Sequence, residues 1–350
     1  MGKAESEPVQ NSADPPRHRR WTWLLRLGLS VLVLFLVFRH IPLDEIGTTL
    51  LAADPAWLLG ALLLTLPILW LAALQLDLLL ETLATPMSVG SIFRITLTTE
   101  FYAFFLPGYL AGGALRWYRL TQSGAPALPT LAALVFNRLI DITITAALGL
   151  GFWWIFPPGG KNTLVIGLLV AILTASFGLH ILVFSPKLAA RARSAVESSA
   201  RGGLIGRILA RISELASAGE ILGSMGSNRR LAVYAVCLAR HIVGVAAIYG
   251  LAISIGMELF WINIGTARSI MLLATLVPIS FAGLGVREGG LIFSLGLFGV
   301  SSSAAAALAV LVLLRDLLIR LAGGLVEAYG WASGRRLISG VTGTSSRPDR

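Results

Sequence analysis

The stretch TLVPISFAGLGVREGGLIF, residues 275–293, decides the fold because it places two charged side chains, Arg287 and Glu288, inside apolar, glycine-rich sequence. An ionised residue at the centre of a bilayer costs about 2.5 to 3.5 kcal/mol even on the most lenient scale. The proline and glycines around the two charges favour a helix that breaks inside the membrane, where protein or water can satisfy the freed backbone groups. We therefore predict a re-entrant turn that borders a polar interior.

The composition of the whole chain supports a membrane location. Of its 350 residues, 56% are hydrophobic and 13% are charged, whereas soluble domains carry about 25% charged residues; the mean hydropathy is +0.80. Apolar runs of about 20 residues can cross a hydrocarbon core of roughly 30 Å as helices. The sequence thus predicts an all-α polytopic membrane protein with about six full transmembrane helices, near residues 21–38, 56–80, 130–155, 163–184, 231–255 and 303–331.

Two further segments, at about 91–129 and 265–301, are long enough to cross but contain helix-breaking residues. These residues are Pro107, Gly108, Gly112 and Gly113 in the first segment, and Pro278, Gly283, Gly285, Gly289 and Gly290 in the second. If each segment crossed once, the arginine-rich loop at 186–230 would lie outside, against the positive-inside rule. If each returns to its own side, that loop and both termini are cytoplasmic. The second arrangement predicts two re-entrant helical elements.

The two broken segments also resemble each other. LPGYLAGGALRW, from residue 106, and VPISFAGLGVRE, from residue 277, share a proline, a later Ala-Gly pair, and an arginine nine residues after the proline, Arg116 or Arg287. Each arginine is followed by an apolar run with a further arginine and an aspartate. We expect an inverted repeat, in which the first element enters from the cytoplasm and the second from the opposite face.

Among the charged residues inside or beside the predicted membrane segments we single out seven arginines and five carboxylates, a surplus of two positive charges: Asp77, Arg94, Glu100, Arg116, Arg138, Asp141, Arg240, Arg287, Glu288, Arg315, Asp316 and Arg320. Most must pair or line a wet cavity. Arginine grips phosphate in a bidentate manner, so we expect a substrate-binding site that includes Arg116, Arg138, Asp141, Arg287, Glu288, Arg315 and Asp316. Structural ion pairs are the alternative for each residue. We expect no catalytic residue, no metal and no cofactor.

The remaining polar sequence lies at the ends and in one loop. Residues 1–20 and 334–350 are predicted to be disordered tails around a membrane domain at 21–333, the first of them basic and cytoplasmic. In the cytoplasmic loop at 186–230, the apolar spacing predicts an amphipathic helix at 203–222, either on the anionic inner leaflet or capping the bundle. The net charge of +10 gathers at helix ends and in this loop, which indicates membrane orientation rather than nucleic-acid binding.

The motifs PISFAGLGVREGGL, LPGYLAGGALRWYRL and NRLIDITITAALG together make this chain similar to the lysylphosphatidylglycerol synthase transmembrane-region family, also called flippase-like domain proteins, over roughly residues 20–333. Gly283 to Glu288 is the specific part. The first element departs from the family, which usually has an acidic residue before the arginine that corresponds to Arg116. The resemblance implies lipid translocation between leaflets, without the soluble aminoacyltransferase domain of bifunctional members. Other relatives serve hopanoid or polyprenyl-linked glycolipid pathways, so the resemblance does not fix the lipid.

The leading hypothesis is therefore a lipid flippase, not an enzyme, that moves an anionic or phosphate-bearing lipid in a bacterial inner membrane. One alternative is a polyprenyl-phosphate-dependent glycosyltransferase, suggested by Asp44 and Glu45 in the first external loop. Another is a scaffold for a lipid-synthesis complex. A homo-oligomer and a lipid-synthesis enzyme are open partner hypotheses.

Overall fold

The structure of the protein, a computed structural model, describes residues 42–85, 87–105, 109–159, 162–185, 217–277 and 283–333, together with a few isolated positions outside these ranges. All regular structure within them is helical, which confirms the all-α prediction. The predicted first span at 21–38, both tails and most of the predicted helix at 203–222 lie outside the described residues.

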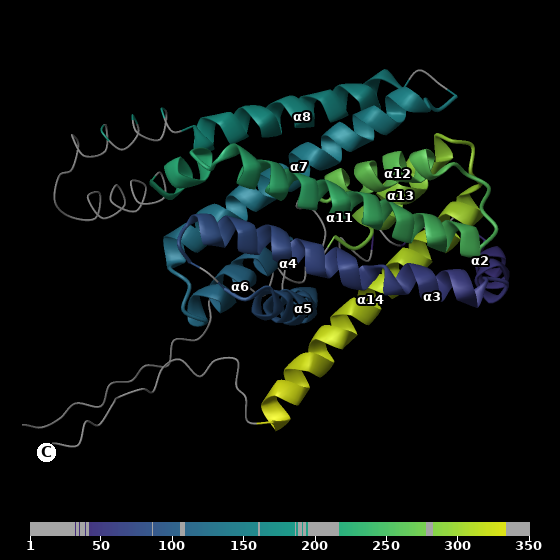
Figure 1. Cartoon of the computed structure of the whole chain (residues 1–350). Helices are drawn as coiled ribbons and strands as arrows, with labels where there is room; N and C mark the ends of the chain where they lie inside the picture. The colour runs from purple at the N-terminus through teal and green to yellow at the C-terminus, as the bar shows by residue number, and fades with distance from the viewer. Residues whose placement is uncertain are drawn as a thin grey trace, which may run out of the picture.

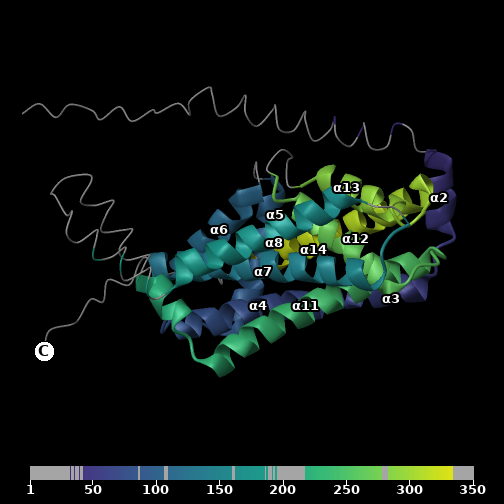
Figure 2. The same ribbon diagram turned by 90° about the horizontal axis from the view of Figure 1, so that it is seen from above.

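The described helices follow one another along the chain as α2 (Leu43–Leu51), α3 (Pro55–Leu63), α4 (Thr65–Thr82), α5 (Val89–Phe105), α6 (Tyr109–Gln122), α7 (Ala127–Ile155), α8 (Thr163–Phe184), α11 (Ser227–Ser254), α12 (Trp261–Ala274), α13 (Val286–Gly296) and α14 (Ser302–Ala332). Figure 1 shows α4, α7, α8 and α11 along a broadly common direction, with α14 crossing them obliquely. Seen from above, α2 lies across one end of this bundle (Figure 2).

Among the described residues, four stretches are long and apolar enough to cross a membrane: Pro55–Thr82, Ala127–Ile155, Thr163–Ile181 and Ser227–Ser254. They match four of the six predicted windows and are those expected of an integral membrane protein. The sixth window coincides with α14, whose 31 residues would extend about 46 Å at 1.5 Å per residue. Since α14 carries several charges near its middle, its crossing stays a prediction.

The second broken segment is interrupted where the sequence predicts it. Gly283 and Gly285 have φ angles of 80° and 83°, a region that side chains with a Cβ rarely adopt. The helix α13 begins directly after them, and the carboxylate of Glu288 accepts a hydrogen bond from the N–H of Gly285 at 2.7 Å. Gly289 and Gly290, by contrast, lie within α13, so the prediction that they break the helix is wrong. An N-terminal cap and the glycine pair therefore define this break.

In the first broken segment, α5 ends at Phe105 and α6 begins at Tyr109. Gly112 and Gly113 lie inside α6, which already begins at Tyr109, so they do not break the helix. A Cβ on Gly112 would come within 3.2 Å of the Cβ of Ala103 on α5. The glycine therefore serves the close packing of the two helices, while the predicted breakers Pro107 and Gly108 lie outside the described residues.

The helices that flank the first break form an antiparallel hairpin. Glu100 of α5 pairs with Arg116 of α6, and Thr98, nearer the start of α5, accepts a hydrogen bond from Arg119, nearer the end of α6. Residues farther from the break on α5 thus contact residues farther from the break on α6. The two helices are therefore antiparallel.

The helices that flank the second break form a second antiparallel hairpin. The hydroxyl of Ser294 on α13 donates to the carbonyl oxygen of Ala267 on α12 at 3.4 Å. A Cβ on Gly290 would lie 3.4 Å from the Cα of Met271. As in the first hairpin, residues farther from the break on one helix contact residues farther from the break on the other, so α12 and α13 are antiparallel.

The two hairpins enter the bundle from opposite ends. The open end of the first, at Ile92 and Leu120, shares a core cluster with the end of α4 and the starts of α7 and α11. The open end of the second, at Ile264 and Leu295, shares another cluster with the ends of α7 and α11 and the start of α14. The tips of the hairpins therefore point toward the middle of the molecule.

The connecting loops divide between the same two ends. Arg229 lies 3.5 Å from Glu81, which brings the start of α11 to the loop after α4. At the other end, the N–H of Asp54 donates to the carbonyl oxygen of Ser254 at 2.7 Å, and the rings of Phe156 and Phe260 are in tilted contact with centroids 5.0 Å apart. This grouping is the one that the charge distribution predicts for two returning segments.

Candidate functional site

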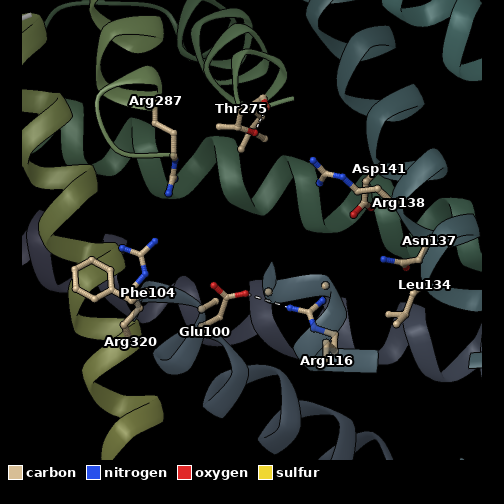
Figure 3. Close-up of a pocket in the computed structure, with 14 residues that line it drawn as sticks. Glu100, Phe104, Arg116, Leu134, Asn137, Arg138, Asp141, Thr275, Arg287 and Arg320 are labelled. Carbon is tan, nitrogen blue, oxygen red and sulfur yellow. Dashed lines mark hydrogen bonds and ion pairs between the residues drawn. The ribbon is translucent and has the colours of Figure 1, made fainter. Parts of the chain in front are cut away.

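A cavity of about 390 Å³ lies between the two hairpins, α7 and α14 (Figure 3). Its lining comprises Glu100, Ala103, Phe104, Gly112, Gly113, Arg116, Leu134, Asn137, Arg138, Asp141, Leu272, Thr275, Arg287 and Arg320. Residues on both sides of each break contribute to this lining: Phe104 and Gly112 for the first hairpin, and Thr275 and Arg287 for the second. The tips of the two hairpins therefore line the same cavity, although the hairpins are far apart in sequence.

One aspartate of α14 holds two arginines at the edge of this cavity. Asp316 is 8% exposed and accepts hydrogen bonds from Nε and Nη2 of Arg315 at 3.2 and 3.0 Å. The other carboxylate oxygen of Asp316 forms an ion pair with Nη1 of Arg287. Asp316 thus balances only one of the two positive charges that it contacts.

Glu288 has a different role from the one predicted. Its side chain is buried, at 4% exposure, and its carboxylate caps the start of α13 through the N–H of Gly285. The ion pair of Arg287 is formed with Asp316 instead. A carboxylate at a helix N-terminus also interacts favourably with the helix dipole, so Glu288 fixes the backbone that carries Arg287.

Two further arginines face the cavity from the other side. Arg116 forms an ion pair with Glu100 at 3.1 Å within the first hairpin. Arg320 of α14 places its guanidinium 5.1 Å from the centroid of the Phe104 ring. In Figure 3 the side chains of Arg287, Arg320 and Arg116 converge on the space at the centre.

A smaller chamber of about 200 Å³ adjoins the main cavity and shares Arg138, Asp141 and Leu272 with it. Its lining adds Ile142, Thr145, Arg240, His241, Arg268, Leu273 and Leu276. We call it the side chamber. Because Arg138 and Asp141 border both spaces, the two chambers are direct neighbours.

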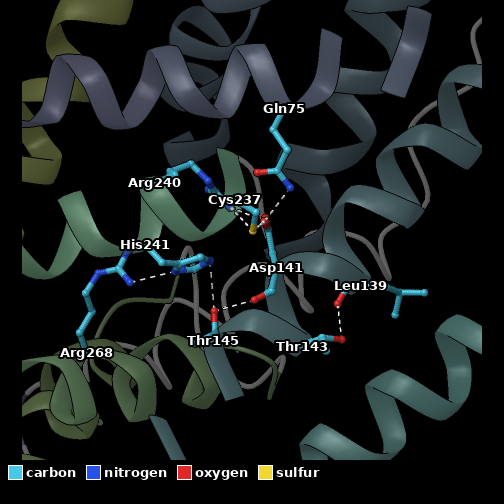
Figure 4. Close-up of polar contacts among 9 residues, drawn as sticks. All are labelled: Gln75, Leu139, Asp141, Thr143, Thr145, Cys237, Arg240, His241 and Arg268. Atoms are coloured by element: carbon cyan, nitrogen blue, oxygen red, sulfur yellow. Dashed lines mark hydrogen bonds and ion pairs between the residues drawn. The ribbon is translucent and has the colours of Figure 1, made fainter. Parts of the chain in front are cut away.

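Asp141 is surrounded by donors from two neighbouring helices (Figure 4). It forms an ion pair with Arg240, and one of its carboxylate oxygens accepts hydrogen bonds from Cys237 Sγ and Gln75 Nε2, each at 3.3 Å. These contacts join α7 to α11 and α4. The carboxylate is therefore a structural acceptor as well as part of the cavity wall.

The hydrogen bonds around His241 have only one consistent direction. Arginine can only donate, so the Nδ1 of His241 accepts from Nη1 of Arg268 at 3.0 Å. The proton of the neutral ring then lies on Nε2, which donates to the hydroxyl of Thr145 at 3.4 Å. That hydroxyl in turn donates to the carbonyl oxygen of Asp141 at 2.6 Å. The chain of hydrogen bonds holds Arg268 in place without neutralising it.

Asp141, Cys237 and His241 bring potential metal ligands within 4.8 Å of one another, but the surroundings do not fit a cation. Arg240 is paired with Asp141, and Arg268 occupies the Nδ1 of His241. A metal ion would have to displace both guanidinium groups and would be repelled by them. The chemistry of this cluster suits an anion.

The structure brings most of the predicted site residues together. Arg116, Arg138, Asp141 and Arg287 line the cavity, whereas Arg315 and Asp316 lie behind Arg287. The residues Glu100, Arg240, Arg268 and Arg320 also belong to the site but were not predicted from the sequence. Arg268 is the only charge in Trp261–Ala274, a signal that would have identified it.

With these residues included, the two chambers and their ion pairs hold seven arginines against four carboxylates, a surplus of three positive charges. The arginines are Arg116, Arg138, Arg240, Arg268, Arg287, Arg315 and Arg320, and the carboxylates are Glu100, Asp141, Glu288 and Asp316. The imbalance is larger than the surplus of two expected from the sequence, which makes the site more strongly suited to an anion.

The family model described as the lysylphosphatidylglycerol synthase TM region matches residues 23–324, nearly the whole chain. The chain therefore belongs to this family, as its motifs predict. A comparison with curated proteins gave no match. Family membership indicates a membrane function related to lipids.

Proposed function

We propose that this family member is a lipid transporter of the flippase type, which moves an anionic or phosphate-bearing lipid between leaflets through the central cavity. The observation that carries this proposal is the cavity itself, where the tips of two hairpins from opposite ends meet and arginines exceed carboxylates. Broken helices in corresponding positions of two halves are the usual sequence pointer to a transport site near the middle of the membrane.

The packing of the helices supports an inverted repeat of two four-helix units, α4 to α7 and α11 to α14. Within each unit the first helix packs on the second and the third on the fourth; between units, α5 packs on α14 as α12 packs on α7, and α4 packs on α11. The hairpins α5–α6 and α12–α13 occupy equivalent places in this scheme. We propose that both are re-entrant elements, which enter the membrane from opposite faces.

The charge distribution supports an orientation as well as a site. One end of the bundle carries Arg229 and Arg230, and the other carries acidic side chains that include Asp54. By the positive-inside rule the basic end faces the cytoplasm of a bacterial inner membrane. Since Cys237 is the only cysteine, a Cys237→Ala variant with a new cysteine at Ser224 can be labelled with a membrane-impermeant thiol reagent. Labelling only in inverted vesicles is expected.

An anionic headgroup in the cavity would relieve an unfavourable charge balance. Buried like charges raise the energy of the empty site, and a phosphate oxygen pair matches the fork of an arginine. The acyl chains would stay in the bilayer, because withdrawing each CH₂ group from an apolar environment costs about 0.8 kcal/mol. In this mechanism only the headgroup passes through the cavity. The arginines there release a carboxylate to bind the headgroup and later return to the carboxylate.

We do not propose an enzyme. Asp44 and Glu45, which suggested a glycosyltransferase, are exposed in the first turn of α2. This helix packs at the end of the bundle, through Ile46 on Ala306 and Ala307 of α14, and neither acid lines the cavity. The geometry thus gives no support to metal-assisted sugar transfer in the described site.

The test is transport of labelled phospholipid in proteoliposomes that contain the purified full chain. Wild type is expected to expose inner-leaflet lipid faster than empty vesicles, and Arg287→Gln is expected to abolish this activity while the protein remains folded. Arg229→Gln is the matched control, because Arg229 lies at the end of the bundle with its side chain 45% exposed. Equal transport by all three proteins would refute a role for the cavity, and no transport by wild type would refute the function.

A further inference from the structure

Arg268 is a cation in the side chamber whose charge no carboxylate balances directly. Among the residues that the structure describes, no acidic side chain forms an ion pair with it. Its hydrogen bond partner is the neutral ring of His241. Arginine stays protonated at neutral pH, so the side chamber holds a positive charge without a direct counter-charge.

Arg320 is in a comparable situation in the main cavity. Its guanidinium lies against the face of Phe104, and its Nη1 is buried without a hydrogen-bond partner. Within the described residues it too forms no ion pair. Arg268 and Arg320 are thus placed one in each chamber.

The position of Arg268 is built into the fold rather than adopted by a loose side chain. A Cβ on Gly244 of α11 would lie only 2.7 Å from the Cζ of Arg268, so the absence of a side chain there makes room for the guanidinium. On its other side, His241 is oriented by the hydroxyl of Thr145. A glycine and an oriented imidazole therefore position the charge.

The side chamber is large enough for a charged group of the ligand. Its volume of about 200 Å³ is several times the roughly 30 Å³ that one water molecule occupies in the liquid. Arg138, Asp141 and Leu272 line both chambers, so the side chamber lies directly beside the main cavity. A headgroup held at Arg320 would extend past these residues toward Arg268.

From this geometry we propose that the side chamber is a second anion subsite, and that the transported lipid carries two anionic groups in its headgroup, as a diphosphate does. One group would lie among Arg320, Arg116 and Arg287 in the main cavity, and the second at Arg268. The identification of the ligand as a lipid rests on the proposed function. The existence of two subsites rests on the arginines alone.

The test compares two short-chain lipids that differ by one phosphate group, dioctanoyl phosphatidic acid and dioctanoylglycerol diphosphate. Their binding to the full chain in detergent is measured by titration calorimetry. Wild type is expected to bind the diphosphate at least about tenfold more tightly, the gain that one added charged hydrogen bond provides. Arg268→Gln should remove this preference and leave monophosphate binding within about twofold, whereas Arg320→Gln should weaken both lipids.

Two further measurements separate the possible outcomes. Gly244→Ala retains the charge but displaces the guanidinium, so it should also reduce the preference for the diphosphate, even if Arg268→Gln fails to fold. Equal binding of both lipids by wild type, or an equal loss of both in Arg268→Gln, would overturn the second subsite. If the preference depends on Arg268 but wild type moves neither lipid in proteoliposomes, the subsite stands and the proposed transport function fails.

Discussion

Replacement of Asp316 by asparagine should destabilise the protein strongly, and replacement of Arg287 by glutamine only slightly. The side chains of Asp316, Arg287 and Arg315 are 11%, 19% and 12% exposed. Asp316→Asn removes the carboxylate that both mostly buried arginines contact, and breaking a buried pair in this way costs about 3 to 5 kcal/mol. Arg287→Gln leaves Asp316 paired with Arg315, so it loses only about 1 kcal/mol of hydrogen bonding.

Thermal unfolding in detergent, followed by tryptophan fluorescence, can resolve this difference. For the roughly 250 residues that the structure describes, the unfolding entropy is about 0.5 kcal/mol/K, so Asp316→Asn should lower Tm by about 6 to 10 °C and Arg287→Gln by about 2 °C. The double variant should have a higher Tm than Asp316→Asn, because one uncompensated charge is gone. Equal effects of the two single variants that add in the double variant would refute the reasoning and make Arg287 a purely structural partner.

Three other substitutions test the supports of the site. Gly285→Ala should cost about 1 to 2 kcal/mol because of its positive φ, while Gly178→Ala, in open space within α8, should not destabilise; Tm distinguishes them. Glu288→Gln should cost about 1 kcal/mol of helix capping and leave lipid affinity in the titration unchanged. Glu327→Gln should cost about 3 kcal/mol or more in thermal unfolding, since it leaves the buried Arg119 without its bidentate partner.

The positions of the long apolar helices could be predicted from the sequence, because hydrophobic composition alone determines them. Apolar length identified the four candidate spans, and the balance of arginine among the loops predicted which loops lie at the same end of the bundle. The breaks were harder to locate, because glycine marks both a turn and a close helix contact. Gly283 and Gly285 make the turn, whereas Gly112 allows α6 to approach α5.

The site was predictable as a set of charges but not as a set of pairs. Arg287 and Glu288 are neighbours in sequence, yet successive residues on a helix point in different directions. Glu288 therefore turns back to its own helix terminus, while Arg287 reaches Asp316 on α14. Arg268 was overlooked because it lies away from the motifs; its place in the site depends on Gly244, a contact between α11 and α12 that sequence spacing cannot reveal.

The pairing at Asp316 bears on how a lipid could pass. An arginine bound to a single aspartate can move to a phosphate only if it leaves a buried negative charge behind, which is costly. Asp316 avoids this cost, since Arg315 remains bound to it when Arg287 moves. Glu288 meanwhile keeps the start of α13 fixed, so the backbone that carries Arg287 need not move with it. Under the proposed function, Arg287 is therefore the arginine that can leave Asp316 for a lipid headgroup and return.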